Sequence, residues 1–130
     1  MATIAKTCQQ LYGCKSQISV RVPSGTDYEA GGLGCFGNMV GIALSTSKGG
    51  QDVVFAGDGV WRCKVKTGEG EKFSAGDKAY IDGETWEIIA LPEEAGTYVC
   101  AGTVLDVDDD GDYITLVLNF FGETATVSGE

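Results

Sequence analysis

The acidic residues of one short segment are the strongest candidates for chemistry in this chain. They alternate along the sequence as Asp106, Asp108, Asp110 and Asp112. With Gly111, this spacing matches the first half of a helix-loop-helix calcium loop, which has oxygen ligands at positions 1, 3 and 5 and then a glycine. Position 12 of such a loop carries a bidentate glutamate, but here it is Val117, so that class of calcium site does not fit. We favour a charged hairpin turn that keeps a sheet edge soluble, and a weak calcium site remains the alternative.

Catalytic groups are scarce elsewhere. The chain has no histidine, which removes the Ser-His and Cys-His nucleophile arrangements and histidine-based zinc hydrolysis. Two pairs of glutamates remain as candidates for general acid-base catalysis. Glu93 and Glu94 are adjacent, and Glu84 and Glu87 are three apart and so face opposite sides of a strand. We therefore predict no enzymatic activity, no catalytic residues, no metal site beyond the weak calcium candidate, and no cofactor.

The five cysteines do not form a metal-binding motif. They are Cys8, Cys14, Cys35, Cys63 and Cys100, and no two of them make a CxxC pair. Their odd number favours reduced thiols. Cys63 and Cys100 lie in apolar strand patterns and are predicted to be small core residues, whereas Cys8 and Cys14 would pair only if the chain met an oxidant.

Charge is distributed unevenly along the chain. The net charge of −10 and the pI of about 4.3 argue against nucleic-acid binding, which requires a basic surface. Residues 1–26 carry Lys6, Lys15 and Arg21 and no acid, whereas residues 79–130 carry no base. A basic segment of this kind is suited to an acidic partner surface. No apolar stretch approaches 18 residues and no signal peptide is evident, so we expect no membrane association and synthesis in a cytoplasm.

The chain is predicted to have three parts. Residues 1–17 form an N-terminal arm, either extended or a short helix with Ile4, Cys8 and Leu11 on one face, which becomes ordered on docking. Residues 18–122 form a single β-rich body of short strands between glycine turns, and residues 123–130 form a tail. The runs 98–107 and 113–121 are the longest, and we expect them at the centre of the sheet. The fold class is all-β, a small barrel or a sandwich.

Aromatic residues in these strands leave a second function open. Trp61, Tyr80, Trp86 and Tyr98 are suited to stacking on sugars, which would make the protein a carbohydrate-binding or adhesin-like module. Trp61, Cys63 and Val65 alternate with Arg62, Lys64 and Lys66, which is the pattern of a strand with one buried face. The three cations need only face solvent. We favour the core interpretation.

Six motifs recur in the same order and at similar separations as in one known family. They are the strand and turn of residues 18–25, Val40-Gly41-Ile42-Ala43-Leu44, Gly57-Asp58-Gly59-Val60, the segment 75–80, Gly102-Thr103-Val104-Leu105, and the closing strand 113–118. In these the chain resembles the small β-rich phage capsid decoration proteins, also called cement or head-stabilising proteins. The arm and the tail lie outside the resemblance, which covers about four-fifths of the chain.

The resemblance implies a β-barrel or β-tulip body that forms a homotrimer. It also implies a position on the outer surface of the virion, at three-fold sites where the trimer bridges subunits of the major capsid protein, and no catalytic residues. Combining this partner with the basic arm, we predict that capsid binding uses Lys6, Leu11, Tyr12, Lys15 and Arg21.

Overall fold

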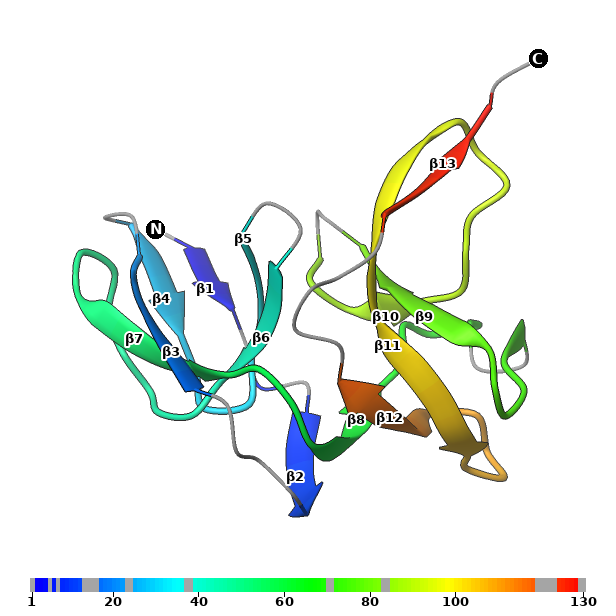
Figure 1. The fold of residues 1–130 in the computed structure, drawn as a ribbon, viewed down its shortest axis with the longest axis horizontal. Coiled ribbons are helices and arrows are strands. Elements are labelled where there is room, and N and C mark those ends of the chain that lie inside the picture. The colour runs from blue at the N-terminus through cyan, green and yellow to red at the C-terminus, as the bar shows by residue number, and fades with distance from the viewer. Residues whose placement is uncertain are drawn as a thin grey trace.

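The computed structural model describes residues 2–4, 6, 8–12, 17–22, 25–36, 39–69, 72–82, 85–118 and 124–128. Within these ranges the chain forms β-strands and no α-helix, which confirms the all-β prediction (Figure 1). The strands are β1 (Ala2–Ile4), β2 (Cys8–Tyr12), β3 (Gln17–Arg21), β4 (Thr26–Tyr28), β5 (Leu33–Phe36), β6 (Met39–Ala43), β7 (Asp52–Ala56), β8 (Val60–Lys64), β9 (Lys78–Ile81), β10 (Ile88–Ile89), β11 (Gly96–Val107), β12 (Tyr113–Leu118) and β13 (Thr124–Val127).

These strands pair in three groups. The largest is a seven-stranded sheet in the order β10-β9-β11-β12-β8-β2, with β13 paired to the beginning of β11. A four-stranded sheet has the order β3-β7-β6-β5, and β1 pairs in parallel with β4. Figure 1 shows β1 and β3–β7 on one side of the molecule, β8–β13 on the other, and β2 between them.

The hairpin of β11 and β12 lies at the centre of the seven-stranded sheet, as the sequence predicts. Val104 is opposite Leu116, and alternate residues of β12 face inward, so that Ile114, Leu116 and Leu118 are buried. On the neighbouring strand β8, Trp61 and Cys63 are buried in the same way, whereas Arg62 and Lys64 face outward. This period-two alternation is what places charged groups on one face and the core on the other.

The seven-stranded sheet curls but does not close into a barrel. Val65, just after β8, makes one isolated parallel bridge with Ile88 of β10, and the Lys66 N–H donates to the Ile88 carbonyl oxygen at 2.9 Å. A closed barrel would need a continuous ladder between the strands at this point. β10 has only two residues, so the predicted barrel is not formed. The apolar alternation in residues 85–91 predicts a strand over that whole run, but β10 covers only Ile88 and Ile89. The reason is local: Trp86 has a φ of 59°, a turn conformation, and its N–H donates to the Asp82 carbonyl oxygen at 2.8 Å.

One apolar core joins the two larger sheets. Leu33, Val40 and Ile42 of the four-stranded sheet pack in the same cluster as Trp61 and Leu116 of the seven-stranded sheet. A second cluster, which includes Ile4, Tyr28 and Phe55, fills the space between β1, β4 and β7. The Tyr28 and Phe55 rings meet edge to face with their centroids 5.1 Å apart.

Two strands lie within the predicted N-terminal arm. β1 pairs with β4, and β2 pairs with β8 at the end of the seven-stranded sheet. Ile4 is 5% exposed and Cys8 is 2% exposed. These residues are extended, so the short-helix alternative is not formed here. A helix of this length is marginal alone, whereas pairing with β8 satisfies the backbone groups on one side of β2. The division of the chain at residue 17 stays a prediction.

Candidate functional site

The acidic turn, residues 106–112, comprises the last two residues of β11 and the hairpin connection to β12. Gly111 has a φ of 75°, its N–H donates to the Asp108 carbonyl oxygen at 2.9 Å, and the Asp108 N–H donates to Tyr113 O at 2.9 Å. A glycine at this position adopts a left-handed conformation that other residues disfavour. The hairpin interpretation thus accounts for the glycine and for the polar residues around it.

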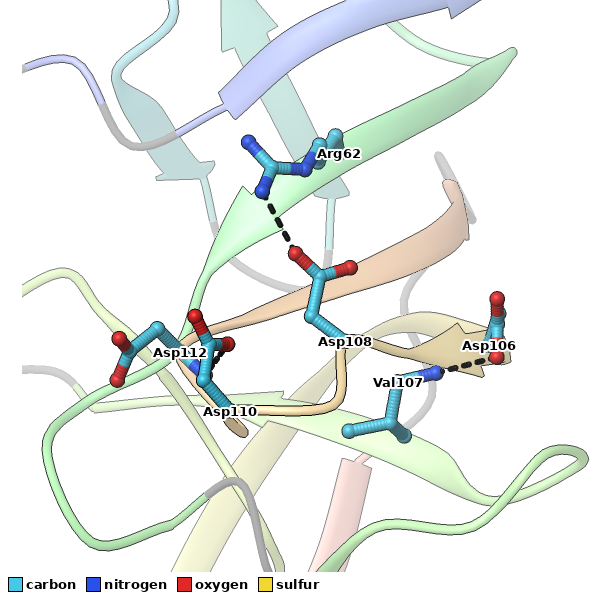
Figure 2. A network of polar contacts seen from close by, with 6 residues as sticks. All are labelled: Arg62, Asp106, Val107, Asp108, Asp110 and Asp112. Carbon is cyan, nitrogen blue, oxygen red and sulfur yellow. Dashed lines mark hydrogen bonds and ion pairs between the residues drawn. The ribbon is translucent and has the colours of Figure 1, made fainter.

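The carboxylates of this turn point in different directions (Figure 2). Asp108 points toward Arg62, while Asp106 accepts a hydrogen bond from the Val107 N–H at 2.9 Å and Asp110 accepts one from the Asp112 N–H at 3.1 Å. Across the described ranges, no three acidic or cysteine side chains gather closely enough to hold a metal ion. The turn is therefore built from local hydrogen bonds and one ion pair.

A small basic hollow lies on the outward face of β2, β8 and β12. Its volume is about 190 Å³, and its lining comprises Lys6, Cys8, Gln9, Arg62, Lys64 and Tyr113. The strand register brings these side chains together, because Gln9 is opposite Arg62 across β2 and β8, and Lys64 is opposite Tyr113 across β8 and β12. Residues far apart in the sequence thus form one positively charged surface.

Arg62 is held in place at the edge of this hollow. Its guanidinium carbon lies 3.8 Å from the centre of the Tyr113 ring, and its Nη2 donates to Asp108 Oδ2 at 2.6 Å. The hydrogen bond and charge of Asp108 raise the pKa of Arg62 above its ordinary value. An exposed ion pair adds little to stability, but together with the stacked ring it fixes the direction of the side chain.

Among the residues that the structure describes, Lys6 and Lys64 have no such partner. Both side chains are exposed, and within the described part of the chain no acidic group lies within 4.0 Å of either amine. Because Asp108 compensates the charge of Arg62, these two lysines carry the net positive charge of the basic hollow. The chain as a whole has a net charge of −10, so this local positive charge suits an acidic partner.

Of the five predicted capsid-binding residues, the three whose side chains the structure describes are divided between the two larger sheets. Lys6 and Leu11 both lie beside β8, and Leu11 is 45% exposed. Arg21 is at the end of β3 in the other large sheet, where its Nε donates to Asp52 at 2.7 Å. Tyr12 is the last residue of β2, but its side chain, like the whole of Lys15, lies outside the described residues.

Sequence reasoning missed Arg62 and Lys64 as site residues. It treated them as charges that need only face solvent, because nothing local distinguishes them from the outward residues of any half-buried strand. The signal was the run of alternating cations in Val60–Lys66 together with the cation at Lys6, but linking them requires the pairing of β2 with β8.

The aromatic residues support the core interpretation in two cases. Trp61 is 3% exposed and its indole N–H donates to Asp58 O at 3.0 Å, and Tyr80 is 8% exposed. Neither ring is available to stack on a sugar. Tyr98 lines a wider hollow of about 510 Å³ that also contains the Lys66–Asp82 ion pair, with the two charged atoms 2.8 Å apart.

Comparison with known proteins identifies the family. No curated protein and no solved structure matches the chain. In the described residues, no helix is long and apolar enough to cross a membrane. The chain does match the phage cement proteins over residues 14–118, which is 105 of its 130 residues and includes β3 to β12. The chain therefore belongs to the phage cement protein family, whose role at the phage capsid is structural and stabilising.

Proposed function

We propose that this protein binds the outside of an assembled phage capsid, as a non-enzymatic homotrimer that bridges neighbouring subunits of the major capsid protein. The family match over residues 14–118 carries the proposal. Three-fold positions and the outer surface are the places that the resemblance implies for such a protein. In this proposal the chain is made in the host cytoplasm and then joins the virion.

The basic hollow is the docking surface that we propose for the capsid. It combines Lys6 of the predicted arm with Arg62 and Lys64 of the body, on the outward face of the seven-stranded sheet. The rest of the chain is strongly acidic, so this surface would meet an acidic region of the shell while the remaining surface faces solvent. Complementary charge gives orientation and a fast encounter more than raw affinity.

Stabilisation of the shell follows from linkage. A protein that binds the assembled capsid and not the separate subunits favours the assembled state by RT ln(1 + [L]/Kd), which is about 2.7 kcal/mol per site at a hundredfold excess over Kd. Bridging adds to this, because each docked trimer holds several subunits at a high effective concentration.

The test uses purified protein and expanded capsids that lack decoration. Imaging should show density outside the shell at three-fold positions, and binding should weaken as salt is raised, because salt screens exposed charges. The double variant Lys6→Glu, Lys64→Glu should bind at least tenfold more weakly, whereas the matched control Lys48→Glu should bind like the unmodified chain. Lys48 is also exposed but lies in the loop between β6 and β7.

Charge reversal is a sharper perturbation here than removal of residues 1–17. Ile4 and Cys8 are buried, so a deletion would expose the core as well as remove Lys6. If the double variant saturates capsids at unmodified affinity, the basic hollow is not the docking surface. If the unmodified chain leaves capsids bare in every salt condition, the capsid proposal itself fails.

A further inference from the structure

Two cysteines face each other across the pairing of β2 and β8. Cys8 and Cys63 are register partners, and both are buried, with exposed fractions of 2% and 0%. Burial, and next to it the neighbouring Cys63 thiol, raise the pKa of Cys8 well above its ordinary value. Both are free thiols, and of the cysteines in the described ranges these are the only two that are partners across a strand pair.

The backbone hydrogen bonds define the type of this pair. The Cys8 N–H donates to Gly31 O at 2.9 Å, on the side of β2 that faces away from β8. Cys8 and Cys63 therefore occupy a non-hydrogen-bonded site of the antiparallel ladder, where opposite Cα atoms are about 4.5 Å apart and side chains are closest. Native disulfides span Cα separations of about 4.4 to 6.8 Å, so this site falls within the range, near its short end.

We propose that Cys8 and Cys63 are a disulfide-forming site that fastens β2 to β8 once the protein leaves a reducing compartment. The oxidant is a small disulfide such as oxidised glutathione. The Cys8 thiolate attacks one of its sulfurs and releases one reduced glutathione, and the Cys63 thiolate then attacks the Cys8 sulfur and releases a second. Two protein thiols are oxidised, one disulfide is reduced to two thiols, and the protons pass to the leaving glutathiones.

The proposed disulfide would hold β2, a segment that the family match does not include. β2 precedes residue 14, where the matched range begins, and it ends the seven-stranded sheet with β8 as its one neighbouring strand there. A bond between residues 8 and 63 would hold this strand, with Lys6 and Gln9 of the basic hollow, on the family body. Reaction requires β2 to open first, because burial keeps both sulfurs from solvent.

The test compares folded and urea-unfolded full-length protein in oxidised glutathione at pH 8, in the Cys14→Ser background that removes the Cys8–Cys14 alternative. Trypsin cleavage after Lys6, Lys15, Arg62 and Lys64 should release peptide 7–15 joined to peptide 63–64, from the folded sample and before any other pairing. The oxidised protein should have a melting temperature several degrees higher, and dithiothreitol should reverse the shift. Amide exchange in residues 8–12 should slow at least tenfold.

Two outcomes overturn the proposal. The first is that Cys8 or Cys63 in the folded protein pairs with Cys35 or Cys100 instead. The second is that both thiols of the folded protein stay reduced even though β2 has been open long enough to react. Amide exchange of residues 8–12 gives the total time that β2 spends open, and this total must exceed the time that the unfolded chain needs to oxidise. The Cys35→Ser variant is the matched control, because it removes a described thiol outside the pair and should oxidise like its parent.

Discussion

Substitution of Gly31 by alanine should loosen β2 without unfolding the body. Gly31 lies between β4 and β5, has a φ of 92°, and accepts the Cys8 N–H through its carbonyl oxygen. A Cβ atom added there would overlap the Cys8 carbonyl oxygen and lie 2.8 Å from Lys6 Cγ. The lysine side chain can move aside, but the Cys8 oxygen belongs to the backbone of β2 and cannot move without shifting the strand.

Two effects contribute to the destabilisation by Gly31→Ala, the strained backbone conformation and the steric overlap, and a control variant separates them. A non-glycine residue in the left-handed region costs roughly 1–2 kcal/mol, and Gly76→Ala pays the same cost because Gly76 has a φ of 95° and open space around its missing Cβ. The overlap at Gly31 adds about 1–3 kcal/mol, typical of overpacking. Since tenfold in an equilibrium constant is 1.4 kcal/mol, the opening of β2 should become about fivefold to a hundredfold more frequent.

Thiol labelling measures this opening directly. In reduced protein carrying Cys14→Ser, iodoacetamide should alkylate Cys8 and Cys63 faster in Gly31→Ala than in Gly76→Ala, by the factor estimated above, because both sulfurs are covered until β2 leaves. Cys100 is buried away from β2, so it reports global unfolding in the same sample. Its labelling rate should be alike in the two variants.

Equal labelling of Cys8 in the two variants would refute the reasoning, since it would mean that β2 does not pack against Gly31. Equal acceleration at Cys8 and Cys100 would also count against it. In that case the overlap would destabilise the whole body, and β2 would not be a separately opening strand.

Three further outcomes follow from the structure. Leu116→Ala should lower the free energy of unfolding by about 2–5 kcal/mol in urea titrations, whereas Val117→Ala, one residue along and facing outward, should cost less than about 1 kcal/mol. Burial raises the pKa values of Cys8, Tyr28 and Cys35, so the stability that their neutral forms contribute is fully present below about pH 8 and is lost as the pH rises through their raised pKa values. The unfolding free energy of reduced protein should therefore fall above about pH 8, and a flat profile from there to about pH 11 would contradict this. Millimolar calcium should leave the melting temperature unchanged, because the carboxylates of the acidic turn are directed to Arg62 and to backbone N–H groups, and a clear rise would restore the calcium interpretation.

The central strands were predictable because the patterns that define them, alternation and turn residues, lie within short stretches of the sequence. Alternation in residues 60–66 predicts the buried face of Trp61, Cys63 and Val65, and the turn at Gly111 between two β-rich runs predicts the hairpin of β11 and β12. Burial of Cys100 follows from the same kind of pattern. Where a local conformation interrupts the pattern, as at Trp86 with its positive φ, the predicted strand is too long.

The candidate site was predictable only in part, because it depends on strand order. Arg62 and Asp108 are 46 residues apart, and Cys8 and Cys63 are 55 apart, so no period or motif connects either pair. The basic segment at the N-terminus led to Lys6, which has no acidic partner among the described residues. It also led to Arg21, which the pairing of β3 with β7 places beside Asp52, where its charge is compensated.

The basic hollow combines residues from inside and outside the matched family range. Arg62, Lys64 and Tyr113 lie within residues 14–118, while Lys6 and Gln9 precede them and reach the hollow through β2. Loss of β2 from β8 would therefore remove Lys6, one of the two lysines of the hollow that have no acidic partner among the described residues, and leave Arg62 compensated by Asp108. The positive charge of this surface thus depends on how firmly one short edge strand is held. If the hollow is the docking surface, a bond between Cys8 and Cys63 would protect capsid binding as well as the fold.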